Sequence, residues 1–201
     1  MHKTLIRIKA FLTITLVWWV FFSASQNPPA YETISTAQGL SQGMVFDLLQ
    51  DKEGFIWVAT KNGLNRYDGY SFKVFTNDPY NAQSLSSNIL KLFEDSKGRI
   101  WAGTENAGLN IYDKQSGKFY RITHSNTNAA SLSGNGIKAI EEMPDGRILV
   151  GTDDAGLNIV ELSNSFFVKG ALPVIPRLSL PNATQVYGMG KDKHGIIWIG
   201  G

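Results

Sequence analysis

Short apolar stretches alternate with tight polar turns along most of this chain. In the first group of stretches, each is four to six residues long, which is typical of a β-strand. They fall at residues 45–50, 55–60, 64–67 and 72–75. The first stretch is mostly apolar, so it predicts a strand buried on both faces. The pattern predicts four antiparallel strands in this part of the chain.

The turns between these strands have a defined chemistry. Asp51 opens the first turn, and Gly54 supplies the positive φ that closes it. The later segments keep this chemistry with Asp95, Asp192 and their glycines, whereas the third uses Pro144-Asp145-Gly146 and has Met143 where the first Asp stands. A second turn also ends in glycine in three segments: Asn62-Gly63, Ala107-Gly108 and Ala155-Gly156.

The whole pattern is an internal repeat. Copies begin at Val45, Ile89, Ile137 and Val186, about 45 residues apart, and four antiparallel strands per repeat of this length are typical of a propeller blade. The sequence therefore predicts an all-β fold, a β-propeller with four-stranded antiparallel blades. The repeats lie near residues 45–76, 89–122, 137–162 and 186–201.

The number of repeats predicts an incomplete propeller. Three blades and part of a fourth are present, whereas a closed ring needs about four to eight blades. We therefore expect residues 26–201 to be the N-terminal part of a longer propeller domain. Its first partners would be the remaining blades and the downstream domains of the same chain.

The first 25 residues predict a secretory signal peptide. Lys3, Arg7 and Lys9 form a positive start, residues 10–22 are almost entirely apolar, and Ser23-Ala24-Ser25 fits a cleavage site. An uncleaved anchor is the alternative, but this apolar run is shorter than the ~20 residues that span a membrane. We expect an exported protein on the periplasmic side of the inner membrane.

The charge and the cysteine content of the chain argue against nucleic-acid binding and against disulfide or thiolate chemistry. The chain has 19 basic and 17 acidic side chains, but three of the basic ones lie in the signal peptide. The mature part is close to neutral and has no basic patch for nucleic acid. The absence of cysteine excludes a disulfide framework and a thiolate metal site, which fits a bacterial periplasm.

Several recurring residues could bind a metal ion or a sugar, but their positions in the repeat favour structural roles. The turn aspartates Asp51, Asp95, Asp145 and Asp192 offer too few oxygen ligands for calcium. Trp57, Trp101 and Trp198 recur in mid-strand, with Leu149 in their place in the third repeat. We interpret these tryptophans as inter-blade packing; sugar-stacking platforms are the alternative.

No catalytic constellation is expected in these residues. His2, His124 and His194 lie far apart along the chain and form no cluster. We interpret Asp153-Asp154 as part of a solvated turn rather than as the carboxylate pair of a glycosidase. We predict no catalytic residue, no metal ligand and no cofactor.

Blade geometry predicts where a ligand would bind. Because the strands alternate in direction, the second turn of each blade and the connection to the next blade lie on one side. The long connections over residues 80–88 and 126–135 are rich in Asn and Ser, which suits a binding rim. The candidate ligand-binding residues are Lys61, Asn62, Glu105, Asn106, Asp153 and Asp154.

Two segments carry a resemblance to a known family. Residues 95–113 read DSKGRIWAGTENAGLNIYD and residues 51–69 read DKEGFIWVATKNGLNRYDG, and both resemble the two-component regulator propeller repeat. Gly39-Leu40-Ser41 resembles the family's lead-in to its first blade. The third repeat departs from the pattern at Met143 and Leu149, and the sequence after Glu161 diverges.

The resemblance implies a function. It implies the N-terminal periplasmic sensor part of a hybrid two-component histidine kinase, which senses an oligosaccharide and acts as a homodimer. The family's later parts would be an immunoglobulin-like domain, a membrane helix and a kinase core. A secreted propeller enzyme that acts on glycans, as a lyase or hydrolase, is the alternative.

Overall fold

The structure is a computed structural model, and it describes residues 31–128, 130–163, 166–167, 175–178 and 185–201. The signal peptide predicted at residues 1–25 lies outside these residues and stays a prediction. Residues 34–201 form one compact unit, distinct from residues 1–33. This unit opens with a short 3-10 helix, η1, at Thr36–Gln38.

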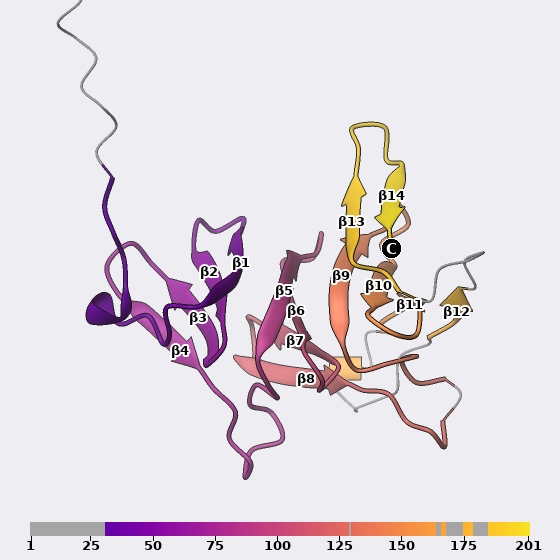
Figure 1. Cartoon of the computed structure of the whole chain (residues 1–201), viewed down its shortest axis with the longest axis horizontal. Helices are drawn as coiled ribbons and strands as arrows, with labels where there is room; N and C mark the ends of the chain where they lie inside the picture. Colours follow the sequence, from indigo (N-terminus) through magenta and orange to yellow (C-terminus); the bar gives the residue numbers. More distant parts are fainter. Residues whose placement is uncertain (1–30, 129, 164–165, 168–174, 179–184) are drawn as a thin grey trace, which may run out of the picture. The chain divides into compact units, whose positions relative to one another are not determined.

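Three four-stranded antiparallel sheets follow one another in chain order, and a two-stranded sheet comes after them (Figure 1). In each sheet the strands pair in sequence order, as the repeat predicts. The first sheet contains β1 (Val45–Gln50), β2 (Ile56–Thr60), β3 (Gly63–Tyr67) and β4 (Phe72–Phe75). The second contains β5 (Ile89–Glu94), β6 (Ile100–Thr104), β7 (Leu109–Asp113) and β8 (Lys118–Ile122).

The third sheet has the same strand order but ends in a very short strand, and the fourth sheet has two strands. Their strands are β9 (Ile137–Glu142), β10 (Ile148–Thr152), β11 (Leu157–Val160), β12 (Arg177–Leu178), β13 (Gly188–Lys191) and β14 (Ile197–Gly200). The range expected for the third repeat, 137–162, does not include β12, which comes after the divergent segment. Strand β12 has only two residues and pairs with β11.

Apolar residues around β12 compensate for its short length. Phe166 and Ile175 are buried in the cluster that joins the second and third sheets. The Tyr120 hydroxyl of β8 donates a hydrogen bond to the Phe167 carbonyl at 3.1 Å, and the two rings meet edge to face. The divergent segment is thus tied to the neighbouring sheet at both of its described ends.

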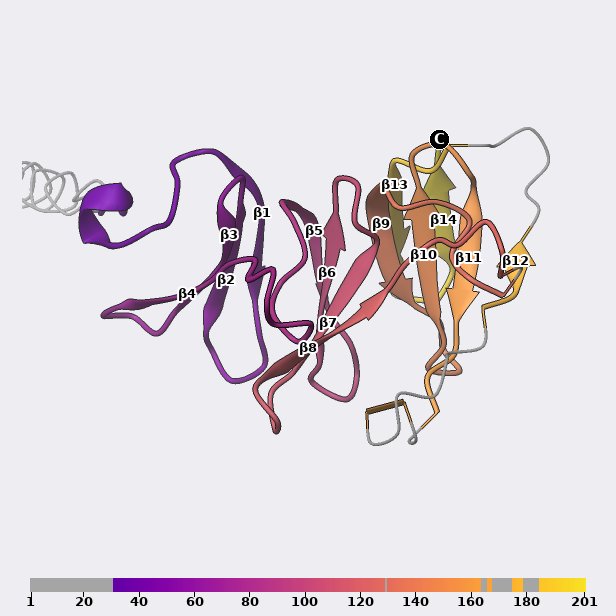
Figure 2. The same ribbon diagram turned by 90° about the horizontal axis from the view of Figure 1, so that it is seen from below.

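The sheets pack on one another as propeller blades (Figure 2). The first strands of successive sheets contact each other in the order β1, β5, β9 and β13. Between the first two sheets, Trp57 and Leu64 pack against Ile89, Leu92 and Tyr112 of the next blade. The all-β propeller fold with four-stranded antiparallel blades, expected from the sequence, is therefore confirmed.

A buried hydrogen bond links the first turn of a blade to its tryptophan. In the first blade, Asp51 accepts the backbone amides of Glu53 and Phe55 at 3.0 Å through one oxygen. Its other oxygen accepts the Trp57 indole N–H at 2.8 Å. Asp95 binds Trp101 in the same way at 2.7 Å, and Asp192 binds Trp198 at 3.2 Å. The third blade lacks both partners and closes its turn with Met143 and Asp145 instead.

Contacts at the same end of the sheets join neighbouring blades. The Lys52 amide donates to the Glu94 carboxylate at 2.9 Å, and the Ser96 amide donates to the Glu142 carboxylate at 2.8 Å. At the interface between the third and fourth sheets, the residue that donates the amide and the residue that supplies the carboxylate are both different. Pro144 has no N–H to donate, and Lys191 stands in place of the glutamate and donates to the Glu142 carbonyl at 2.9 Å.

Two expectations about burial are wrong. Strand β1 is not buried on both faces, since Val45 and Phe46 are 42% exposed and Leu48 is 63% exposed. Trp198 is 66% exposed and does not pack between blades, unlike Trp57 and Trp101, which are fully buried. The reason is common to both: the described residues place a neighbouring blade against only one side of the first and last sheets.

Removal of a fully buried tryptophan should destabilise the fold. We expect Trp101→Ala to lower the free energy of unfolding by about 3–5 kcal/mol, as for other large truncations in a core. Trp101→Phe should cost less, because a large aromatic ring is kept and only part of the buried volume is lost together with the bond to Asp95. Chemical denaturation monitored by circular dichroism measures both. Tyr70→Ala, at a side chain 96% exposed, is the matched control and should change the free energy of unfolding by less than about 0.5 kcal/mol. Unchanged stability in Trp101→Ala would contradict the packing role.

The first-turn carboxylate should make folding sensitive to acid. Burial by itself would raise the pKa of Asp51, but hydrogen bonds from Trp57, Lys114 and the Phe55 amide lower that pKa below its ordinary value of 3.8. The unfolded state then binds the proton more tightly than the folded state. The stabilisation from Asp51 is complete above that ordinary value and is lost as the pH falls through the lowered pKa.

Equilibrium unfolding from pH 6 down to pH 2 tests this expectation. In Asp51→Asn, stability at neutral pH should fall, and the loss of stability toward acid should be shallower than in the unmodified protein. An equally steep acid dependence in the variant would show that other carboxylates dominate.

Candidate functional site

A buried threonine shapes the second turn of every complete blade. Thr60, Thr104 and Thr152 end β2, β6 and β10, and all three are fully buried. Each hydroxyl donates to the carbonyl of the turn glycine, at 3.0, 2.7 and 2.9 Å respectively. Each also accepts a backbone amide of the turn. The second and third turns have the same length and contacts, and the first is one residue shorter but is held by the same threonine. The residues at the tips of all three turns point away from the core.

A buried asparagine on the third strand holds the segment that leads into each blade. Asn65, Asn110 and Asn158 are fully buried. Their side-chain oxygens accept the amides of the lead-in serines Ser41, Ser86 and Ser133 at 2.9, 3.2 and 2.9 Å. The leucine before each of these serines is also buried. The sequence carries this signal as a Leu-Ser pair that recurs at residues 40–41, 85–86 and 132–133.

The described residues of the two long connections make the same turn contacts. Residues 77–85 and 124–132 both end in an Asn-Ala-x-Ser-Leu sequence. Ser84 and Ser131 each donate an amide hydrogen to the asparagine carbonyl at 3.0 Å. The same two serine hydroxyls accept the amides of Asp78 and Ser125 near the loop start. The connections are therefore built parts of the surface rather than loose linkers.

The structure brings the predicted rim residues beside these connections. Glu105 accepts a hydrogen bond from Asn88 at 3.3 Å, and Asn106 accepts one from Ser87 at 3.1 Å. The Asp153 amide donates to the Gly136 carbonyl at 3.0 Å, and its carboxylate lies 3.6 Å from Lys138. The second turns and the connections do share one end of the blades. The role of these residues in binding a ligand stays a prediction.

Lys61 and Asn62 border a groove beside the first connection. The groove has a volume of about 210 Å³ and is lined by Lys61, Asn62, Gly63, Asn77, Leu85, Ser87 and Asn88. Asp154 sits at the tip of the third turn, with its carboxylate close to Gly134 of the second connection. All six predicted rim residues therefore lie at the same end of the blades.

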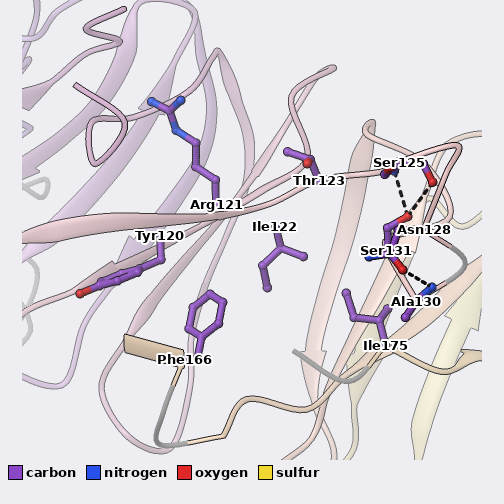
Figure 3. Close-up of a pocket in the computed structure, with 10 residues that line it drawn as sticks. All are labelled: Tyr120, Arg121, Ile122, Thr123, Ser125, Asn128, Ala130, Ser131, Phe166 and Ile175. Carbon is purple, nitrogen blue, oxygen red and sulfur yellow. Dashed lines mark hydrogen bonds between the residues drawn. The ribbon is translucent and has the colours of Figure 1, made fainter. Parts of the chain in front are cut away.

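A second hollow lies beside the outer strand of the second blade (Figure 3). It has a volume of about 310 Å³, and the side chains of Tyr120, Phe166 and Ile122 lie on its apolar side. Most of its polar groups are already engaged. Arg121 donates to the Ser84 and Leu85 carbonyls, and the Ser131 hydroxyl bonds within its own loop. The groove and the rim are therefore the better candidate site.

The other end of the blades has a charged hollow with a structural origin. It measures about 440 Å³ and includes Lys97, Arg99 and Lys114. Lys114 is 2.9 Å from Asp51 and 3.2 Å from Glu94, so its charge is used between the first two blades. Arg99 is paired with Asp95. Lys114 therefore stabilises the interface between the first two blades, and the charge of Arg99 is used within its own blade.

Among the described residues, no helix has the length and hydropathy needed to cross a membrane. Comparison with known proteins gives relatives for these repeats. Residues 39–62 and 83–106 match the family described as two component regulator propeller. A stretch of 77 residues is 38% identical to Histidine kinase P4 of Formosa agariphila and covers 38% of this chain.

Two solved structures from B. thetaiotaomicron are similar to this chain, and both are extracellular domains of putative hybrid two component systems. One has a TM-score of 0.67 and 25% identity over 84% of this chain, and the other has 0.60 and 22% over 83%. This chain spans 23% and 21% of those two structures, and its match spans 5% of the histidine kinase.

The matched segments run from the lead-in through the first turn, the tryptophan strand and the tip of the second turn. These are the parts that the structure shows to be held by the buried Asp, Thr and Asn contacts in the first two blades. Residues 39–62 and 83–106 match the two-component regulator propeller family, and they form the lead-in and the first two strands of two β-propeller blades.

Proposed function

We propose that this chain forms part of the periplasmic sensor domain of a hybrid two-component histidine kinase. The regulator propeller repeats support this, as do the relatives named as a histidine kinase and as extracellular domains of hybrid two component systems. The predicted signal peptide at residues 1–25 agrees with export to the periplasmic side of the inner membrane. The remaining blades and the downstream domains of the same chain would carry the signal, in a homodimer.

We further propose that the sensor binds an oligosaccharide at the rim. The observation that carries this proposal is that the three second turns and two connections bring amide, hydroxyl and carboxylate side chains together at one end of the blades. Such groups bind sugar hydroxyls through hydrogen bonds in both directions. Backbone hydrogen bonds hold the supporting loops, so that little conformational entropy is lost when a ligand binds.

The rim also offers a physical means of sensing. Lys61 and Asn62 of the first blade line the groove together with Asn88, which directly precedes β5, so the groove borders both blades. A ligand that contacts both would bind most tightly to one arrangement of the two blades. Binding would therefore favour that arrangement over others, which is the basis of a population shift.

Binding of a panel of neutral and acidic oligosaccharides to the full-length protein tests the proposal. Isothermal titration calorimetry should detect at least one binding oligosaccharide. The double variant Asn106→Ala/Asp154→Ala should weaken that binding about tenfold or more, equivalent to about 1.4 kcal/mol. Gln115→Ala, at the opposite end of the blades, is the control and should bind normally.

Two results would contradict the proposal. Equal affinity of the rim double variant and the unmodified protein, with an unchanged melting temperature, would exclude the rim as the binding site. Conversion of the oligosaccharide to a shorter or unsaturated product by these residues would favour the alternative of a propeller enzyme.

A further inference from the structure

The groove of the first blade is a local exception to the repeat. It lies between the second turn, at Lys61–Gly63, and the connection that leads to β5. Three residues separate Leu85 from Ile89 in that connection, whereas four separate Leu132 from Ile137 in the next one. The second turn beside the groove is also one residue shorter, since Thr60 bonds to Gly63 whereas Thr104 bonds to Gly108, so both the turn and the connection leave more space at the first blade.

The extra residue occupies that space at the second blade. The Asn135 carbonyl accepts the Gly108 amide at 2.9 Å, and its side-chain oxygen accepts the His124 amide at 2.8 Å. A Cβ atom added at Gly108 would lie 3.2 Å from the Asn135 side chain, which shows how closely the loop covers that turn. The first connection has no such residue, and its groove stays open.

The open groove presents unpaired polar groups. The Lys61 and Asn62 backbones are fixed, since their amides donate to the Met44 carbonyl at 3.4 Å and to Thr60 Oγ1 at 3.2 Å. Both side chains are exposed, and within the described part of the chain neither makes a hydrogen bond or an ion pair. Lys61 is the one charged residue that lines the groove.

The surrounding charges leave the Lys61 cation available. At the third blade the rim lysine, Lys138, is paired with Asp153. Asn88 lines the first groove and donates a side-chain hydrogen bond to Glu105. Glu105 itself does not line the groove. Asn88 keeps a second side-chain hydrogen, and Asn62 offers a whole amide group. A lysine with two amide donors beside it is suited to a carboxylate.

We infer that this groove is a subsite for the carboxylate of an acidic sugar, held by Lys61 with Asn62 and Asn88. The inference rests on the proposed function, because it assigns one residue of the oligosaccharide ligand to one place on the rim. The groove volume of about 210 Å³ lies below the roughly 300–1,000 Å³ of whole-ligand pockets. It therefore holds one substituent, and the rest of the oligosaccharide lies along the rim.

Matched probes separate the subsite from the sensor function. The probes are tetrasaccharides of galacturonate, mannuronate and glucuronate, each with its neutral methyl ester, titrated into the full-length protein. At least one free acid should bind, and its methyl ester should bind at least tenfold more weakly. Lys61→Met should weaken binding of the acid about tenfold, the size expected for loss of a charged hydrogen bond. Lys61→Met should not change binding of the ester.

Three further variants test whether the positive charge, the position of the lysine and the open groove are each required. Lys61→Arg should bind within threefold of the unmodified protein, and Lys193→Met, which removes an exposed lysine in a turn at the opposite end, should bind normally. Insertion of one Asn between Ser87 and Asn88, which copies the longer connection, should close the groove and abolish the preference for the acid while Lys61 is kept. Unchanged melting temperatures exclude misfolding.

Each contrary result has a distinct meaning. Binding of neutral oligosaccharides without any preference for the acid, or equal binding by Lys61→Met and the unmodified protein, would overturn the subsite and leave the sensor function standing. Failure of every acidic and neutral oligosaccharide to bind would overturn both proposals.

Discussion

Packing of one sheet against the next is the interaction on which the other features of this protein depend. A four-stranded sheet has two faces, and a single blade has no second layer with which to bury either of them. Trp57 and Trp101 resolve this problem because each fills the space between its own sheet and a neighbour. The indole N–H would be left without a partner in such a place, and the turn aspartate supplies one.

The ends of the blades are ordered because their polar groups are tied to this packing. Thr104 and Asn110 are fully buried between apolar strands, so their side chains hold the turn and the lead-in in fixed places. The rim is then free to vary at its tips without a change in the fold. Lys61, Glu105 and Asp153 stand at equivalent places in three blades and differ in charge. Variable tips on a constant support are what a recognition surface requires.

The sequence predicts the repeat well and its exceptions poorly. Strand periodicity places the four strands of the first blade, β1 to β4, to within one residue, because turn glycines with positive φ fix where each strand ends. The hydrogen bond between Asp51 and Trp57 joins residues six apart and leaves no trace in the hydrophobic pattern. Strand β12 escapes prediction because it has two residues and follows a divergent segment. The burial of β1 depends on a neighbouring sheet, which its own sequence does not contain.

The location of the candidate site could be predicted from the sequence, but its groove could not. Alternation of strand direction predicts that the second turns and the connections share one end, and the structure agrees. The open groove beside Lys61 was not predicted, because it results from differences of one residue in the connection and in the adjoining second turn. Asn135 fills the equivalent space through its backbone carbonyl and side chain, and neither contact has a signature in composition or spacing.

The third interface shows that these blades are not interchangeable parts. At the first two interfaces an amide of one blade faces a glutamate of the next, and at the third a proline faces a lysine that donates in the opposite direction. A repeat duplicated unchanged into the fourth position would set a carboxylate against a proline nitrogen that carries no hydrogen. Growth of such a chain by duplication therefore requires paired changes on the two facing blades, and the order of the repeats becomes fixed once those changes have occurred.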